Sequence, residues 1–146
     1  MIRRFGGPPD PGCIYRHRPG AYAILERDGL LLVTRQDADP PEYQLPGGGL
    51  EPGEQPLPAL YREIVEETGW RARLHRKLGV FRRFTYMPDY GFHAEKLCHI
   101  YLGRPVIRLG PPGEADHQAA WMTPQEAAAR LAVGGDRHFV RRYLCP

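Results

Sequence analysis

The segment from Leu57 to Thr68 most restricts how this chain can fold, because it combines a helical pattern with defined ends. Five apolar residues recur at the i, i+3, i+4, i+7, i+8 spacing of a core-facing stripe, namely Leu57, Leu60, Tyr61, Ile64 and Val65. Pro56 or Pro58 fits the first helical turn, where a missing N–H costs little, and Gly69 fits a left-handed cap. The sequence therefore predicts a short amphipathic helix that packs on a core through one face.

Three acidic residues share the other side of this helix. At about 100° per residue, Glu63, Glu66 and Glu67 fall within an arc of roughly 100°. Carboxylates packed so closely repel one another, and burial would raise their pKa values unless a cation neutralised them. Oxygen ligands without a nearby His or Cys favour magnesium or manganese over zinc. A solvated acidic helix face is the competing interpretation, which the helix alone does not exclude.

Strand patterns flank the helix on both sides. The apolar runs 21–26 and 30–34 enclose Arg27-Asp28-Gly29, whose Asp-Gly pair predicts a hairpin. Residues 36–43 contain two prolines and predict an irregular loop before the glycine run 47–49. Further strands are predicted from β-branched and aromatic residues over 80–86, 94–102, 104–109 and 119–122, with Gly103 as a break.

The C-terminal segment predicts two more helices. Residues 123–126, Thr-Pro-Gln-Glu, have the form of a capping box with proline in the first turn, so a helix is expected to start there. Gly134-Gly135 is predicted to end that helix, and residues 136–144 to form a third, short one.

Length and composition indicate one globular domain. A chain of 146 residues can bury one sizeable core, so we expect an N-terminal extension or strap over 1–16 and one domain over 17–146. The net charge of +3 is far below that of a dedicated nucleic-acid binder. Three scattered cysteines argue against a disulfide framework, and neither an export signal nor a membrane span is visible, so a cytoplasmic location is expected.

The residues around the acidic helix complete a longer pattern. Gly48, Glu54 and the run from Arg62 to Trp70 match Gly-x5-Glu-x7-Arg-Glu-U-x-Glu-Glu-x-Gly-U, in which U is hydrophobic. This pattern is the Nudix box, and the sequence therefore resembles the Nudix hydrolases, which include MutT-like enzymes. The last hydrophobic position of the motif is Trp70, where an aliphatic residue is usual. The resemblance implies an α/β fold, a Nudix-type α/β/α sandwich with a central mixed sheet.

The resemblance also implies roles for the residues of the box. It makes Glu66 and Glu67 the main metal ligands and Glu63 a further ligand or the group that activates water. Arg62 would orient the glutamates, a task that suits its rigid, permanently charged fork of donors. Glu54 would support the site, and the carbonyl of Gly48 would face the metal, where glycine permits a close approach.

The implied reaction is magnesium-dependent hydrolysis of a pyrophosphate bond in a nucleoside diphosphate linked to a group X. X would be a nucleotide, a sugar, a second nucleoside on a polyphosphate, or the ribose of ADP-ribose. The general base is not fixed by the box: Glu63 and Glu67 stay candidates, as do Glu114 and Asp116 in the loop before Trp121. Glu114 is preferred over Asp116 because its longer side chain can reach inward, although a solvated loop acid is an equal alternative.

Candidates for substrate contact lie outside the box. Arg35 ends a predicted strand and could hold a phosphate, while Tyr43 and Gln44 precede the glycines, where they could read a nucleobase. Exposure for Arg35 and core packing for aromatic residues are the alternatives; Tyr86 and Tyr90 raise the same question. Alternation along a strand places Arg82 and Arg83 on opposite faces, and Cys98 and His99 likewise, which excludes the latter as a metal pair.

Two other functions stay open at this stage. The chain could be a non-catalytic module that senses a nucleotide, although such relatives usually have a degraded box or an attached DNA-binding domain, and neither is visible. It could also remove pyrophosphate from RNA 5′ ends, which would change the partner but not the chemistry. The sequence names neither the group X nor the oligomeric state, and a homodimer is one option among relatives.

Overall fold

A computed structural model describes residues 2–114 and 116–146. Its strands are β1 (Arg3–Arg4), β2 (Tyr15–Arg27), β3 (Leu30–Gln36), β4 (Glu42–Gln44), β5 (Gly47–Gly49), β6 (Trp70–Met87), β7 (Phe92–Arg108) and β8 (His117–Met122). Its helices are α1 (Pro56–Thr68), α2 (Pro124–Arg130) and α3 (Gly134–Leu144). None of the helices in the described ranges has the length and hydropathy needed to cross a bilayer.

The eight strands form one mixed sheet in the order β1-β6-β7-β2-β3-β4, with β5 paired to β2 and β8 paired to β3. The pairs β1·β6 and β2·β7 are parallel, and the others are antiparallel. The β2·β7 pair runs from Tyr15 opposite His93 to Leu25 opposite Gly103, so it forms the centre of the sheet.

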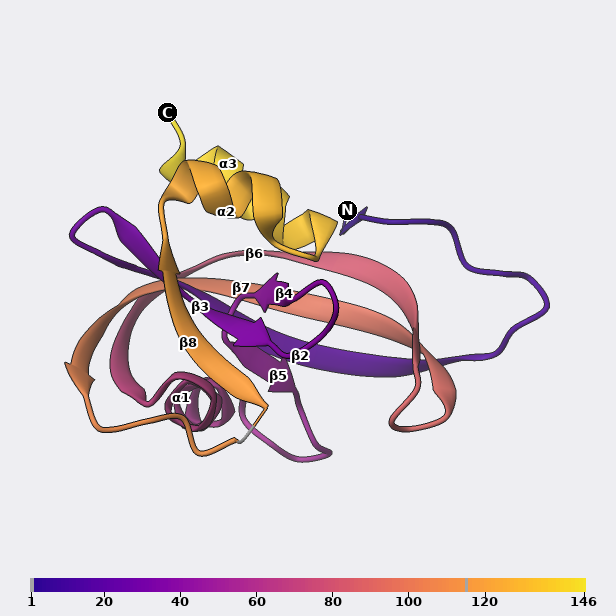
Figure 1. Ribbon diagram of the computed structural model, residues 1–146. Helices are drawn as coiled ribbons and strands as arrows, with labels where there is room; N and C mark the ends of the chain where they lie inside the picture. The colour runs from indigo at the N-terminus through magenta and orange to yellow at the C-terminus, as the bar shows by residue number, and fades with distance from the viewer. Residues whose placement is uncertain (1, 115) are drawn as a thin grey trace.

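Helices cover both faces of this sheet (Figure 1). On one face, Leu60 and Ile64 of α1 pack against small and aliphatic residues of β2 and β3. On the other, residues of α2 and α3 such as Ala127 and Val140 pack around Phe81. A mixed sheet between helical layers confirms the predicted α/β/α sandwich.

Turn chemistry behaves as the sequence predicts. Asp28 and Gly29 both have positive φ, 54° and 80°, and close the hairpin between β2 and β3. Gly69 caps α1 in the left-handed conformation at φ 75°, and a Cβ there would overlap the Gly110 carbonyl oxygen. Thr123 and Glu126 form the full capping box of α2.

The predicted apolar stripe of α1 is wrong at its edges. Leu57 and Tyr61 are 43% and 37% exposed, whereas the helix buries Ala59, Leu60, Ile64, Glu67 and Thr68. The helix is therefore rotated so that an acid faces inward. The polar contact that Glu67 makes with the neighbouring glycine strand accounts for this rotation, since it satisfies a carboxylate that helical periodicity alone would place outside.

Two predicted breaks are also wrong. Gly103 does not divide a strand: β7 runs through it, and a Cβ at this position would overlap the Arg73 carbonyl oxygen of β6. Gly134-Gly135 begins α3 rather than ending α2, which stops at Arg130. Gly135 is required there because a Cβ would enter the Phe81 ring. At the other end of the chain, Arg3 and Arg4 pair with Phe81 and Arg82 of β6.

Candidate active site

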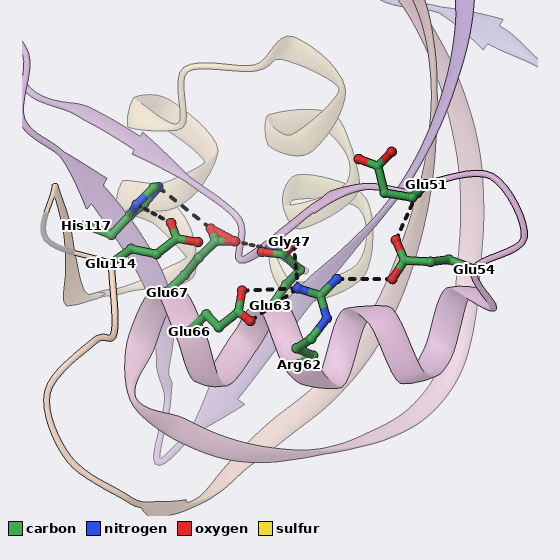
Figure 2. Close-up of polar contacts among 9 residues, drawn as sticks. All are labelled: Gly47, Glu51, Glu54, Arg62, Glu63, Glu66, Glu67, Glu114 and His117. Carbon is green, nitrogen blue, oxygen red and sulfur yellow. Dashed lines mark hydrogen bonds and ion pairs between the residues drawn. The ribbon is translucent and has the colours of Figure 1, made fainter. Parts of the chain in front are cut away.

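The glycine strand β5 lies against the acidic face of α1 (Figure 2). The backbone N–H of Gly47 donates a hydrogen bond to Oε1 of Glu67 over 3.1 Å. Gly47 has φ 144°, and a Cβ there would collide with the Ala21 carbonyl oxygen. At Gly48 a Cβ would lie 3.4 Å from the Glu63 carboxyl carbon. Glycine at position 47 is therefore required for β5 to pack on β2, and a side chain at position 48 would contact the Glu63 carboxyl group.

Arg62 holds the outer carboxylates of the site. Its Nη1 lies 3.2 Å from both oxygens of Glu66, and its Nη2 lies 3.1 Å from Oε2 of Glu54. A longer contact of 3.4 Å joins Nη1 to Glu63. Glu54 is fixed further by the backbone N–H of Glu51 at 2.8 Å, and this bond, together with Arg62, lowers the pKa of its carboxyl group. The guanidinium thus fixes acids from a loop and from a helix together.

The three helix acids are buried to different degrees, in the order Glu66, Glu63 and Glu67 around the helix. The exposed fraction of the side chain falls from 40% for Glu66 to 20% for Glu63 and 7% for Glu67. Burial raises the pKa of Glu67 to about 9, and the neighbouring carboxylates of Glu63, Glu114 and Glu66 add to it against the Gly47 hydrogen bond. Burial likewise raises the pKa of Glu63. Such a cluster is stable as carboxylates only beside a cation.

The loop after β7 adds a fourth acid. Gly113 and Glu114 donate their backbone N–H groups to the Glu66 carbonyl oxygen at 2.8 and 3.3 Å, which docks the loop on the end of α1. Carboxylate oxygens of Glu63, Glu66 and Glu114 consequently lie within 4.8 Å of one another. The side chain of Asp116 is 79% exposed, against 38% for Glu114. Glu114, the loop acid preferred on chain length, is therefore the one that reaches the cluster.

His117 belongs to the site, although no sequence motif indicates it. Its Nδ1 lies 2.8 Å from Oε2 of Glu114, a close polar contact without the alignment of a hydrogen bond. Its Nε2 lies 3.1 Å from the Gln36 amide nitrogen and 3.9 Å from Oε2 of Glu67. The histidine was missed because strand β8 was expected from Ala119, two residues later. Its position three residues after Glu114 was the available signal.

Of the predicted substrate-contact residues, Arg35 and Tyr43 are register partners in the β3·β4 pair, and Gln44 pairs with Thr34 next to them, but their side chains make different contacts. Arg35 contacts Asp37 at 3.3 Å and Gln118 at 3.5 Å on β8. Tyr43 is partly buried, packs against the core and lies under the Arg130 guanidinium, 4.7 Å from its ring centroid. Gln44 lines an open groove of about 610 Å³, which Tyr86 and Tyr90 also line. Of these candidates, Gln44, Tyr86 at the end of β6 and Tyr90 in the β6–β7 turn line this common groove.

The predicted alternation of β6 and β7 is confirmed. Arg82 pairs with Glu95 at 3.6 Å, whereas Arg83 lines the groove on the other face of the sheet. Cys98 is buried in the core, while His99 contacts Lys77 at 2.7 Å on the opposite face. Cys98 and His99 therefore form no metal pair.

Comparisons with known proteins agree with this geometry. The family model described as the NUDIX domain matches residues 16–143. A MutT-like protein of Streptomyces ambofaciens is 32% identical over 118 residues, which cover 77% of this chain and 67% of that protein. The chain belongs to the Nudix hydrolase family.

Further relatives differ in the substrates that their names give. A putative 8-oxo-dGTP diphosphatase of Bacillus subtilis is 47% identical over 72 residues, 48% of this chain and 47% of that protein. An ADP-ribose pyrophosphatase of the same organism is 32% identical over 108 residues, 70% of this chain and 55% of that protein. The chain thus spans about half to two thirds of the length of these curated relatives.

Solved structures show the same fold. A Nudix hydrolase from Nitrosomonas europaea superposes with a TM-score of 0.71 at 22% identity, covering 88% of both chains. The solution structure of the E. coli ORF135 protein gives a TM-score of 0.63 at 26% identity, covering 90% of this chain and 95% of that one.

Proposed function

We propose that this protein hydrolyses a pyrophosphate bond in a nucleoside diphosphate linked to another group X, in a reaction that requires Mg²⁺. The observation that carries the proposal is the convergence of the Glu63, Glu66 and Glu114 carboxylates within 4.8 Å beside the buried Glu67. The complete Nudix box and the family membership support it.

The donor set of the site fits a hard divalent cation. Glu63, Glu66 and Glu67 offer carboxylate oxygens, and Gly48 is the proposed source of a carbonyl oxygen. Burial, and then the neighbouring carboxylates, raise the pKa of Glu67, and a cation beside it would oppose both effects. Mn²⁺ suits the same ligands. When bound, such an ion offsets the charge of a pyrophosphate and lowers the pKa of water that it coordinates.

The remaining roles belong to the side chains of this chain. Arg62 keeps Glu66 and Glu54 in place, so ligand positions are set before substrate arrives. Glu114 is the proposed proton acceptor for the attacking water, because it lies on a loop docked against α1 and is still partly exposed. Glu63 and Glu67 are the alternative bases, and substitution of each acid by Gln distinguishes them.

The substrate class is proposed from the relatives and their printed activities. Their names give 8-oxo-dGTP, ADP-ribose and, for mammalian proteins 41% identical over 58 residues, diphosphoinositol polyphosphate. All three contain a pyrophosphate bond, the bond that we expect to be hydrolysed at the acidic cluster. A small phosphorylated molecule is thus the expected partner, and the expected compartment is the cytoplasm, which suits three free cysteines.

A substrate panel tests the proposal. Purified protein with Mg²⁺ should release a nucleoside monophosphate, pyrophosphate or phosphate from a member of a set of oxidised nucleotides, nucleotide-sugars, dinucleoside polyphosphates and ADP-ribose. Glu66→Gln should reduce that rate at least about 100-fold, whereas Glu51→Gln, the same charge change in the adjacent loop, should not. Inactivity on the whole panel would contradict the proposal, and tight binding without turnover would indicate a sensing module instead.

A further inference from the structure

The groove beside the acidic site has a basic floor. Besides Gln44, Tyr86 and Tyr90, its lining includes Arg83 of β6 and Lys96 of β7. The groove also begins next to the acids: Gln36 lines it and contacts His117, whose same ring nitrogen faces Glu67. Gln36 and His117 thus connect the rim of the groove to the acidic cluster.

Three cations lie side by side across the sheet, and two of them, Arg83 and Lys96, line the groove. Arg83 is the register partner of Lys96 in the β6·β7 pair, and Arg18 is the register partner of Lys96 in the β2·β7 pair. Register partners on adjacent strands point to the same face and lie about 5 Å apart. We call Arg83, Lys96 and Arg18 the basic row. Like charges in directly opposite positions are destabilising, so the row costs stability unless an anion occupies it.

The basic row has no carboxylate partner at ion-pair distance. Across residues 2–114 and 116–146, no carboxylate oxygen lies within 4.0 Å of a nitrogen of Arg18, Arg83 or Lys96. The Nε atom of Arg18 is buried without a hydrogen-bond acceptor, and its guanidinium lies 5.2 Å from the Tyr90 ring centroid. A buried donor of this kind is costly unless a ligand satisfies it.

Nearby acids offset the charge of the row only in part. Asp136 is buried beneath Lys96 and Arg83 and lines a small cavity with them. Burial raises the pKa of its carboxyl group to about 7 against the lowering effect of these two cations. Glu42 and Asp89 line the groove from its exposed rim. Burial and the charge of Arg83 lower the pKa of Lys96, as expected for cations without a sufficient counter-charge.

We propose that the basic row binds a phosphate group of the substrate other than the scissile pyrophosphate. The substrate then carries either a phosphate ester on group X or a polyphosphate chain longer than two phosphates. A phosphate offers several acceptor oxygens and a charge of its own, which match two guanidinium forks and one ammonium group. A neutral sugar or base would leave these three cations without a negative counter-charge. This inference rests on the proposed function for the position of the scissile bond.

A binding experiment without a divalent ion tests the row alone. Inorganic tripolyphosphate is titrated calorimetrically into the protein in EDTA, where the acidic cluster repels anions and contributes nothing. The double substitution Arg83→Gln with Lys96→Met should weaken binding at least tenfold. The matched control is Arg82→Gln with Lys77→Met, which removes the same charges from the opposite face of the sheet and should change binding less than twofold. Thermal unfolding of both variants verifies that each is folded.

Hydrolysis then separates the two sources of phosphate. The wild type should prefer a dinucleoside tetraphosphate to the diphosphate, or ADP-ribose with a 5-phosphate on its terminal ribose to ADP-ribose, by at least tenfold in kcat/KM. The double variant Arg83→Gln with Lys96→Met should lose this preference for the substrate with the additional phosphate. Absence of tripolyphosphate binding by the wild type, or equal weakening in both double variants, overturns the inference. If tripolyphosphate binding depends on the basic row but the protein hydrolyses no substrate, the inference about the row stands and the proposed function is contradicted.

Discussion

Glu67 accepts a hydrogen bond from the backbone N–H of Gly47 over 3.1 Å, which joins the last turn of α1 to the glycine strand β5. This bond holds a carboxyl group at 7% exposure beside three other acids, Glu63, Glu66 and Glu114. The arrangement is unfavourable for folding without a cation, and it positions oxygen ligands before any cation binds.

Substitution of Glu67 by Gln should therefore stabilise the protein in EDTA. The amide oxygen keeps the Gly47 hydrogen bond, and Gln removes the cost of burying a carboxyl that must take up a proton on folding at neutral pH, because its pKa rises to about 9. We expect the melting temperature in EDTA to rise by about 2–4 °C, equivalent to roughly 1 kcal/mol, and the stabilisation by Mg²⁺ to be lost. Glu66→Gln, at a more exposed position, should change the melting temperature in EDTA less than Glu67→Gln does. A Glu67→Gln protein that melts lower in EDTA, or that is still stabilised by Mg²⁺, would contradict this account.

Arg62 should be more important for activity than for stability. Its guanidinium reaches Glu54 with one nitrogen and both oxygens of Glu66 with the other, and a Lys ammonium cannot span these positions. Arg62→Lys should lower kcat/KM at least about tenfold. Because the ion pairs are half-exposed, the free energy of unfolding should change by less than about 1 kcal/mol. Arg71→Lys, in the exposed part of β6, is the control, and a loss of activity equal in both variants would refute the role.

His117 should act through Glu114. Removal of the imidazole frees the Glu114 side chain, which now has a contact of 2.8 Å with Nδ1. We expect His117→Ala to lower kcat at least about tenfold with a smaller change in KM, and Glu114→Gln to lower it further. If the histidine only positions the acid, adding His117→Ala to Glu114→Gln should cost little more. Fully additive losses in the double variant would show an independent role for His117.

The glycine strand offers a paired test of fold and site. Gly47→Ala should prevent stable folding, because its φ of 144° is strained for alanine and the methyl group would enter the Ala21 backbone. Gly48→Ala should fold, since its methyl group would meet only the Glu63 side chain at 3.4 Å. Circular dichroism and a Mg²⁺ titration of the folded variant check both outcomes, and Mg²⁺ affinity should fall at least several-fold. Equal effects of the two substitutions would be inconsistent with the geometry.

Asp136 should make stability depend on pH. Its pKa rises on folding from 3.8 to about 7, so the folded protein holds a proton that the unfolded chain releases. This contribution to the free energy of unfolding is consequently full below about pH 4 and is lost as the pH rises to about 7, by at most about 4 kcal/mol. In urea titrations between about pH 4 and pH 7, the free energy of unfolding should fall less for Asp136→Asn than for the wild type. Parallel curves for the two proteins would show that Asp136 does not titrate as described.

Local chemistry made several elements predictable from the sequence. The Asp28-Gly29 turn, the Gly69 cap and the Thr123 capping box each depend on backbone geometry that only a few residue types satisfy. The Nudix box was equally readable, because its spacing already places Glu63, Glu66 and Glu67 on one helix face. In these cases the information lies within a few neighbouring residues.

Features that depend on contacts between distant segments were not predictable. The inward rotation of Glu67 depends on Gly47, and Gly103 stays within a strand because it packs on Arg73. His117 joins the site through register with β3, where it lies opposite Gln36. The basic row likewise exists only because β2, β7 and β6 are neighbours, an order that no local pattern contains.

The most direct test of the central claim is the initial rate of pyrophosphate-bond hydrolysis as a function of Mg²⁺ concentration, with the best substrate of the panel. We predict no rate in EDTA, a rate that saturates with Mg²⁺ in the wild type, and a loss of at least about 100-fold in Glu66→Gln. Equal rates with and without the metal, or equal rates in the two proteins, would show that the acids of α1 do not form a catalytic metal site.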